Sequence, residues 1–119
     1  MSSLWSKYFA ASEKRYTYET ENGFVSYHIQ DGVCIIQDFY VEPGFRGSKL
    51  AMTLAKWVER DAKNKGCTAL AGEVYHASPN AEYILRLHRH WGMVQTERDE
   101  YKTLSVKELK NDKRRTIIA

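Results

Sequence analysis

The sequence predicts a single domain of the α/β (α+β) class, built on a mixed, mostly antiparallel sheet flanked by helices. With 119 residues the chain has about the length of one domain. Short β-prone runs alternate with turn dipeptides in its first half, and a strand, a sharp turn and a long helical repeat follow one another in the middle. Hydrophobic residues (43%) and charged residues (28%) are balanced as in a folded globular protein.

The first element is expected to be a short amphipathic helix from about Ser3 to Lys14. Leu4, Tyr8 and Ala11 recur there at helical spacing, with Trp5 and Phe9 beside them. The aromatic side chains of this helix are expected to pack on the sheet.

A β-meander is expected next. Arg15 to Thr20 and Phe24 to Gln30 have the composition of strands, separated by Asn22-Gly23, a dipeptide suited to the positive backbone angles of a tight hairpin turn. Asp31-Gly32 repeats this signal before the run from Val33 to Val41. That run is nearly continuous in β-branched and aromatic residues, as in a central strand covered on both faces.

A strand–helix–strand crossover follows the meander. Pro43 and Gly44 end the third strand, and Gly47 to about Lys65 has a helical repeat made by Leu50, Leu54, Val58 and Ala62. Cys67 to Tyr75 is the next expected strand. Because such crossovers are right-handed and make their two strands parallel, a crevice for a ligand is expected where these strands splay.

The last elements are a helix and a hairpin. Ser78-Pro79-Asn80 is a plausible helix start, Gly92 closes the helix, and one side of it carries Ala81, Ile84, Leu85, His88 and Trp91. Met93 to Thr96 and Tyr101 to Val106 are expected to form a hairpin around Asp99-Glu100. We therefore expect one domain over residues 1–106 and a basic tail over 107–119.

The net charge and the cysteine content indicate which partners and which cellular compartment to expect. The net charge is +3, and much of the excess lies in the tail, which is more typical of a solvated terminus than of a nucleic-acid contact. Cys34 and Cys67 are too few for a disulfide framework, so buried free thiols are expected. The sequence has neither a signal-like hydrophobic run nor a membrane span, so we expect a cytoplasmic protein.

The passage from Gln37 to Ala51 joins a strand end, a sharp turn and a helix start. Such a junction points unpaired backbone N–H groups at the positive end of a helix, which favours an anion such as phosphate. Arg46 would add a cation and Ser48 a hydroxyl that either caps the helix or donates to the anion. Alternatively, the glycines only make the turn and Arg46 is a solvated charge.

This passage resembles the acetyl-CoA-binding motif of the GNAT superfamily of N-acetyltransferases, through Val41, Pro43, Arg46, Gly47 and Ala51. The resemblance implies the single-domain GNAT fold, with a central parallel splay. It also implies acetyl-CoA as co-substrate, with strand residues pairing with the pantetheine arm and the turn wrapping the pyrophosphate; these residues would be Phe39, Tyr40, Val41, Arg46, Gly47, Ser48, Lys49, Leu50 and Ala51. Lys49 replaces the usual middle glycine, and its side chain would either crowd the pyrophosphate or bind it.

The pattern around Gln37 and Asp38 is also similar to polyamine acetyltransferases of the same superfamily. Asp38 matches an aspartate of that pattern, whereas Gln37 replaces a glutamate. An amine reaches the reaction as an ammonium and must lose a proton, so Asp38 would act as a base or bind the substrate cation. The alternative is an aspartate that is hydrogen-bonded within the sheet.

The helix before Gly92 resembles a later motif of the family, in which a tyrosine faces the coenzyme sulfur. His88 stands at the position of that tyrosine, and its spacing from Ile84 and Trp91 turns it inward. A histidine of near-neutral pKa could protonate the leaving thiolate or relay a proton, with Tyr83 as the competing acid and a merely packed histidine as the alternative. Asn80 is one residue out of register with the cofactor-binding asparagine of the motif.

The resemblance implies an N-acetyltransferase that transfers an acetyl group from acetyl-CoA to a small amine or a protein lysine, by direct attack in a ternary complex. Asp38, His88 and Gln37 are the candidate catalytic residues. No metal is expected, because His88 and His90 lie on different helix faces. A homodimer is compatible with these features, and we expect no nucleic-acid partner. The competing hypothesis is a degenerate GNAT fold that acts as a binding or inhibitory protein.

Overall fold

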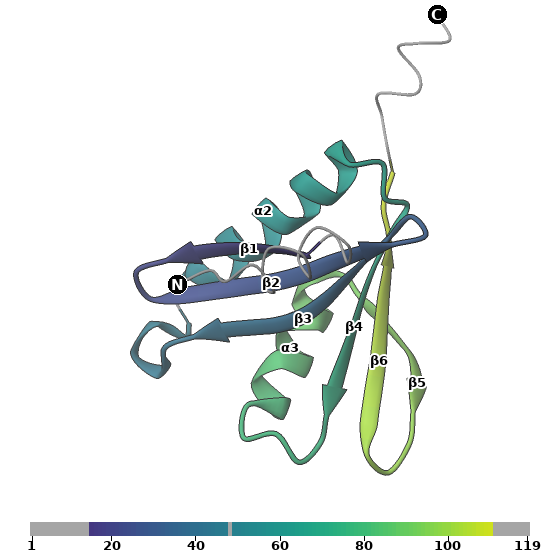
Figure 1. Cartoon of the computed structure of the whole chain (residues 1–119). Helices are drawn as coiled ribbons and strands as arrows, with labels where there is room; N and C mark the ends of the chain where they lie inside the picture. Colours follow the sequence, from purple (N-terminus) through teal and green to yellow (C-terminus); the bar gives the residue numbers. More distant parts are fainter. Residues whose placement is uncertain (1–14, 48, 111–119) are drawn as a thin grey trace, which may run out of the picture.

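The computed structural model describes residues 15–47 and 49–110. The expected helix from Ser3 to Lys14, residue Ser48 and the end of the basic tail lie outside the described residues. Within the described part, the chain forms a six-stranded sheet in the order β1-β2-β3-β4-β6-β5, together with two α-helices (Figure 1).

The elements follow the predicted order along the chain. The strands are β1 (Arg15–Thr20), β2 (Gly23–Gln30), β3 (Val33–Val41), β4 (Ala69–Tyr75), β5 (Val94–Arg98) and β6 (Lys102–Glu108). The helices are α2 (Leu50–Asn64), which follows a short 3-10 turn at Pro43–Phe45, and α3 (Ala81–Trp91). Only β3 and β4 pair in parallel among the described strands, and all other pairs are antiparallel. The predicted α+β fold class is therefore confirmed.

Several boundaries differ from the prediction. Helix α2 begins at Leu50 rather than at Gly47, whose φ of +87° places it in the left-handed region before the helix. At the other end of the domain, β6 continues past Val106 to Glu108, and Leu109 is buried in the core. Lys107, which was expected to open the tail, thus belongs to the strand.

The first hairpin turns one residue earlier than Asn22-Gly23 suggests. Thr20 pairs with Gly23, so Gly23 is the first residue of β2 and has no positive φ. A Cβ atom at Gly23 would stand 2.7 Å from the carbonyl oxygen of Tyr40 on β3, so the glycine is needed for close strand approach rather than for the turn. The second turn is as predicted, with φ of 52° at Asp31 and 78° at Gly32.

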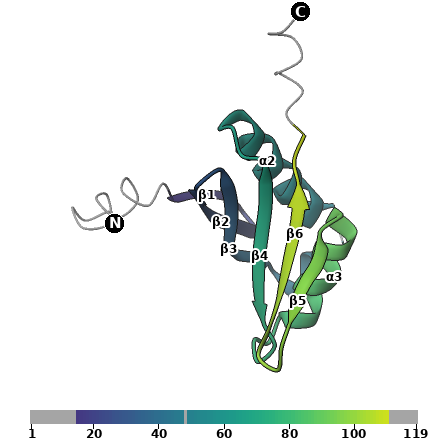
Figure 2. The same ribbon diagram turned by 90° about the vertical axis from the view of Figure 1, so that its right-hand side faces the viewer.

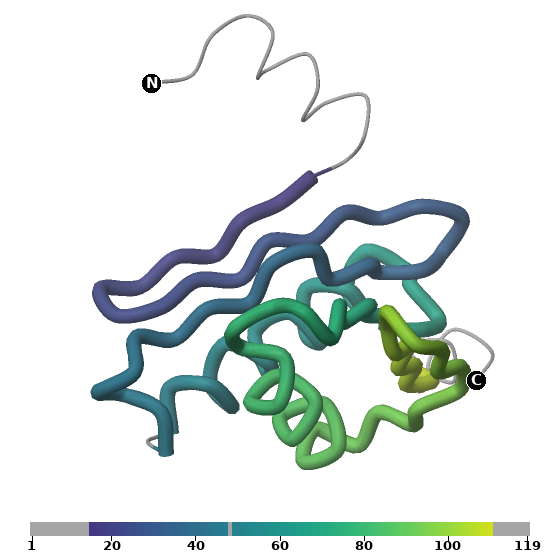
Figure 3. Tube along the Cα trace, turned by 90° about the horizontal axis from the view of Figure 1, so that it is seen from below, coloured from purple at the N-terminus to yellow at the C-terminus, as the bar shows by residue number. Residues whose placement is uncertain are grey.

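Both helices cover the same side of the sheet (Figure 3). Helix α2 packs on β2 and β3, α3 packs on β4 and β5, and the two helices contact each other. Leu54 and Val58 of α2 are fully buried in the resulting core, where each contributes about 1.5–3 kcal/mol of hydrophobic stabilisation. In β3, Cys34, Ile36, Phe39 and Val41 point into this core, while Val33, Ile35 and Tyr40 are half-buried. Among the described residues the strand thus buries one face fully, instead of the two expected. Figure 2 shows the β4-β6-β5 half of the sheet, with α3 lying beside β5.

Candidate functional site

The parallel strands β3 and β4 separate about halfway along their length. Pairing between β3 and β4 runs from Val33–Ala69 to Ile36–Gly72 and stops there, although β3 continues to Val41 and β4 to Tyr75. In Figure 1 the two strands diverge below this point. Beyond Ile36, no described strand pairs with β3 on its β4 side, so this edge of the strand is available to a ligand.

A β-bulge shapes the start of the splay. Ser26 of β2 pairs with Asp38, whereas the next residue, Tyr27, pairs with Ile36, so Gln37 is the extra residue in β3. The bulge breaks the alternation of the strand, leaving both Gln37 and Asp38 exposed between buried Ile36 and Phe39. Two consecutive polar residues in an apolar run were the sequence signal of this irregularity.

A cavity of about 540 Å³ opens at the splay. Predicted site residues line it from β3 (Gln37, Asp38, Phe39 and Tyr40) and from α3 and the loop before it (Asn80 and His88). Its other walls are Phe24, Ile36, Gly72, Glu73, Val74, Tyr75, Ser78, Ala81 and Ile84. The β4 residues were missed by the sequence analysis, although a glycine inside a predicted strand, Gly72, is a signal of close approach.

The charge of this cavity is negative. Asp38 and Glu73 are carboxylates on its wall, and no lysine or arginine is among the residues that line it. Glu73 is partly neutralised from outside the cavity, because its Oε2 lies 2.7 Å from Nζ of Lys102. Asp38 has no such ion pair among the described residues, so it is the more available partner for a cation.

His88 forms part of the cavity wall from α3 and is only 2% exposed. Its ring packs against Gly72, where a Cβ atom would stand 2.9 Å from Cε1 of the ring. Burial lowers the pKa of His88 to about 4, so the near-neutral pKa expected from the sequence is wrong and the ring is neutral at pH 7. Nδ1 is buried without a hydrogen-bond partner in the described structure, so this polar atom is unsatisfied in the free protein.

Tyr83, the competing acid, lies on another face of α3 and is not among the residues of this cavity. Its ring stacks under the guanidinium of Arg46, with 4.6 Å between Cζ and the ring centroid. Burial raises the pKa of its hydroxyl, against a smaller opposing effect of Arg46 and Arg86.

Arg46 joins the end of β3 to the start of α3. Its Nε donates to the carbonyl oxygen of Val41 at 2.9 Å, and its Nη2 donates to Oδ1 of Asn80 at 2.9 Å. Arg46 is therefore not the solvated charge of the alternative hypothesis. Asn80 does not cap α3 with its side chain, since its amide oxygen is used by Arg46.

A second cavity, of about 610 Å³, lies between the start of α2 and α3. Arg46, Gly47 and Ala51 line it from the turn and α2, facing Tyr83, Arg86 and His90 on α3. Lys49 is the N-cap residue of α2, is exposed and makes no side-chain cap, whereas Leu50 is half-buried. Because Asn80 lines the first cavity and Arg46 the second, their hydrogen bond stands at the boundary between the two.

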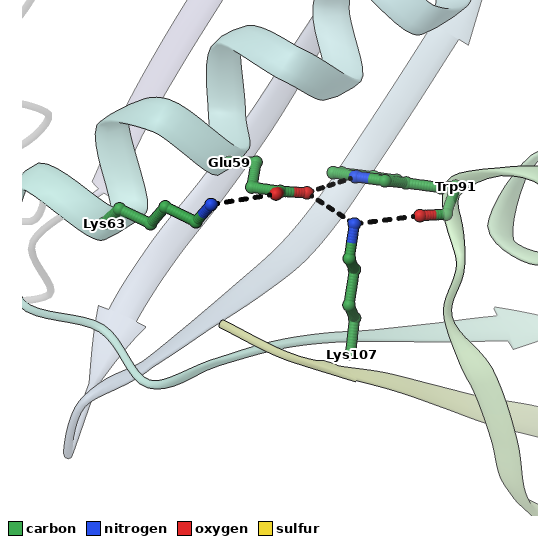
Figure 4. Close-up of polar contacts among 4 residues, drawn as sticks. All are labelled: Glu59, Lys63, Trp91 and Lys107. Carbon is green, nitrogen blue, oxygen red and sulfur yellow. Dashed lines mark hydrogen bonds and ion pairs between the residues drawn. The ribbon is translucent and has the colours of Figure 1, made fainter. Parts of the chain in front are cut away.

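A polar cluster centred on Glu59 of α2, which the sequence did not predict, holds the two helices and the sheet together (Figure 4). Oε1 of Glu59 accepts hydrogen bonds from Nε1 of Trp91 at 2.9 Å and from Nζ of Lys107 at 2.8 Å. Nζ of Lys107 also donates to the carbonyl oxygen of Trp91, and Lys63 lies 3.3 Å from Oε2 of Glu59. The cluster ties α2, the end of α3 and β6 together.

Two further findings concern cysteines and metals. Cys34 and Cys67 are buried free thiols, as predicted, and burial raises the pKa of Cys34 to about 12. Over residues 15–47 and 49–110, no group of three or more His, Cys, Asp or Glu side chains is placed to hold a metal ion. Neither described helix is long and apolar enough to cross a membrane.

Comparison with solved structures supports the same fold. The PaiA N-acetyltransferase of Thermoplasma acidophilum, solved in complex with coenzyme A, is similar with a TM-score of 0.72 and 16% identity, over 87% of this chain and 69% of that one. The ribosomal-protein-S18-alanine N-acetyltransferase of Escherichia coli is similar with a TM-score of 0.66 and 13% identity, over 87% of this chain and 76% of that one. No protein of curated function matches the sequence.

The sequence itself matches a family model over most of its length. Residues 5–93 fit the model of the acetyltransferase (GNAT) family, a range that contains the bulged strand, the turn, α2 and α3. The fold of that family supports acyl transfer from an acyl-CoA. This chain belongs to the acetyltransferase (GNAT) family.

Proposed function

We propose that this protein transfers an acetyl group from acetyl-CoA to a primary amine by direct attack in a ternary complex. The observation that carries the proposal is the acidic cavity at the β3–β4 splay, which joins an open strand edge, an available carboxylate and a buried unpartnered histidine. Because no covalent enzyme intermediate is needed, the protein contributes positioning, hydrogen bonds and proton handling.

The described residues fit an acyl-CoA. The open edge of β3 at Phe39–Val41 offers backbone groups to the amides of the pantetheine arm, as the family resemblance implies. The cavity beside the start of α2 offers the pyrophosphate a helix N-terminus together with Arg46. In this proposal the exposed ammonium of Lys49 contacts the pyrophosphate and takes over part of the role of the missing glycine.

A cationic acceptor fits the first cavity best. Asp38 and Glu73 attract an ammonium, and no cationic side chain of the lining opposes it. Asp38 accepts the proton that the amine must lose before attack, directly or through a water molecule. Gln37, the bulged residue, orients the acceptor by hydrogen bonding.

His88 acts as a neutral hydrogen-bonding group. Its pKa of about 4 keeps the ring uncharged at pH 7, so the ring carries only one of its two possible N–H protons in the free protein. A neutral imidazole carries one N–H and one lone pair, so it can donate a hydrogen bond to the leaving sulfur while its other nitrogen accepts a proton. This relay replaces the general acid expected from a histidine of near-neutral pKa.

The test is release of free thiol from acetyl-CoA by the full chain, measured across matched amines. Cadaverine, a diamine, is compared with δ-aminovalerate, in which a carboxylate replaces the second amine. We expect faster thiol release with cadaverine, because the acidic cavity favours a second positive charge over a negative one. Preference for δ-aminovalerate would refute the acidic acceptor site, and no amine-dependent release with any acceptor would refute acetyl transfer.

A further inference from the structure

A third cavity, of about 380 Å³, lies on the side of α3 that faces β5. Three arginines converge on it, Arg86 and Arg89 from α3 and Arg98 from the end of β5. Arg86 and Arg89 are three residues apart, so they share one helix face. The buried side chains of Ala81 and Leu85 complete the wall between them.

The three guanidinium groups have no partner in the described part of the chain. None of them takes part in a hydrogen bond or an ion pair there, in contrast to Arg46. The neighbouring polar groups are engaged elsewhere: Nδ1 of His76 bonds the carbonyl of Glu100 at 3.1 Å and Nε2 bonds Oγ1 of Thr103 at 2.7 Å. Both ring nitrogens of His76 are therefore already engaged within the protein.

Glu82 lines the cavity, and Glu73, Glu97 and Asp99 line a neighbouring hollow together with Arg98, but no ion pair joins any of them to the three arginines within the described residues. Asp99 accepts hydrogen bonds from the backbone N–H groups of Tyr101 and Lys102, at 2.7 and 2.8 Å. The three positively charged guanidinium groups around this cavity repel one another. An anion bound between them would attract all three and offset that repulsion.

We propose that this cavity is a binding site for a phosphate group. Arginine presents a planar fork of N–H donors that matches the oxygens of a phosphate, and several forks directed at one hollow can share its oxygens. The site lies on a different face of α3 from the acyl-transfer cavity, with which it shares only Ala81 among the lining residues. Binding of a phosphate group here does not depend on the proposed function, whereas a coenzyme phosphate as its source rests on that function.

The phosphate has two possible sources, a free phosphorylated molecule or the coenzyme itself. Arg86 also lines the cavity beside α2, whereas Arg89 and Arg98 do not. A 3′-phosphate of coenzyme A that reached past Arg86 would therefore meet the other two arginines. Substituting Arg89 and Arg98 tests the site without altering the residues that line the cavity beside α2.

The experiment titrates the full chain with pyrophosphate and follows the Nε–Hε signals of the arginine side chains by NMR. We expect saturable shifts of Arg86, Arg89 and Arg98. In the double variant Arg89→Gln/Arg98→Gln, the Arg86 signal should report pyrophosphate binding about 10-fold weaker, as expected from the loss of charge-assisted hydrogen bonds. The Arg46 signal, which reports the proposed coenzyme pyrophosphate site beside α2, should titrate as in the wild type. Arg60→Gln, which removes an exposed arginine of α2, is the matched control and should bind as the wild type does.

The two sources are separated by titrating the same proteins with coenzyme A and 3′-dephospho-coenzyme A. A loss in the double variant that affects pyrophosphate alone supports a free phosphorylated ligand. A loss that also affects coenzyme A, but not its dephospho form, supports the coenzyme phosphate in the same site. Equal pyrophosphate affinity of the wild type and the double variant, or an equal loss in Arg60→Gln, would overturn the proposal.

Discussion

At the scale of single residues, the chemistry of the splay depends on side chains that an irregular strand presents to it. The extra residue Gln37 turns Asp38 out of the core and into the acidic cavity. There Asp38 has no ion-pair partner among the described residues, so its charge is available to an amine. In the proposed function, the carboxylate therefore serves the acceptor.

The variant Asp38→Asn should lower kcat/KM for a cationic amine by about 100-fold, since a positioned proton acceptor contributes on the order of 10²–10⁴. The affinity for acetyl-CoA should be nearly unchanged, because the proposed coenzyme contacts use backbone groups and the turn. Thiol-release kinetics and calorimetry measure the two quantities.

Glu19→Gln, a change of the same kind on the exposed side of β1, is the control and should leave kcat/KM unchanged. An Asp38→Asn protein with wild-type kcat/KM would remove Asp38 from the proton path. It would leave the fold assignment untouched.

A second prediction concerns the contact between Gly72 and His88. A Cβ atom at residue 72 would stand 2.9 Å from Cε1 of His88, so Gly72→Ala should push the imidazole away from the cavity wall. We expect turnover to fall at least about 10-fold, since small displacements of catalytic groups are costly.

The measurement is kcat by thiol release, together with the NMR signals of the His88 ring. Gly44→Ala, at a glycine with open space around its Cβ position, is the control. Wild-type kcat with an unmoved ring would contradict the role given to this contact.

Individual residues were predictable where a periodic pattern determines their direction. The spacing of His88 from Ile84 and Trp91 placed it on the inward face of α3, which the structure confirms. Its depressed pKa was not predictable, because it depends on burial against β4, a strand distant in the sequence. The hydrogen bonds of Arg46 to Val41 and Asn80 were likewise not predictable, because they depend on the distance between the end of β3 and the start of α3 in the folded protein.

At the scale of elements, the Glu59 cluster connects α2, the end of α3 and β6. Its directional hydrogen bonds fix the relative positions of these elements more specifically than hydrophobic packing alone would. Burial opposes the charge of Glu59, but hydrogen bonds from Lys107 and Trp91 outweigh it and lower the pKa of the carboxyl. The side chain is 20% exposed, so the bonds are only partly screened by solvent.

Glu59→Gln should lower the free energy of unfolding by about 1.5–3 kcal/mol, the range for hydrogen bonds to a charged group. Urea unfolding at pH 7 measures this loss, with Glu97→Gln on exposed β5 as the control that should change stability little. Equal stability of Glu59→Gln and the wild type would show that the cluster is dispensable.

Elements with a strong local signal were predicted well. The bounds of β1 and β3 are as expected, because clear turn signals and a proline punctuate them. The position of β6 between β4 and β5 was not predictable from apolar periodicity. Its inward residues Thr103 and Ser105 are fully buried yet polar, so the strand does not resemble a central one in sequence.

At the scale of the whole molecule, stability should decrease as the pH falls below neutrality. The pKa of His88 is about 4 in the folded protein and near its ordinary 6.5 in the unfolded chain, so between these values the unfolded state binds the proton more strongly. This contribution is complete above pH 6.5 and is lost as the pH falls toward 4.

The wild type should lose about 2 kcal/mol from this group between pH 7 and pH 5. In His88→Gln the loss over this interval should be smaller by that amount, as measured by urea unfolding at both pH values. Glu59 acts only at lower pH, because its stabilisation is lost as the pH falls below the ordinary carboxyl pKa of 4.5. Identical pH dependence in the wild type and the variant would contradict the burial of a neutral His88.

The central claim is that the splay and the turn before α2 bind acetyl-CoA for transfer. Calorimetric titration of the full chain with acetyl-CoA tests it most directly. We predict saturable binding of one acetyl-CoA per chain, weakened in Lys49→Glu because a carboxylate would repel the pyrophosphate. A chain that binds no acetyl-CoA would contradict the proposed transfer and favour a GNAT fold that serves only as a binding protein.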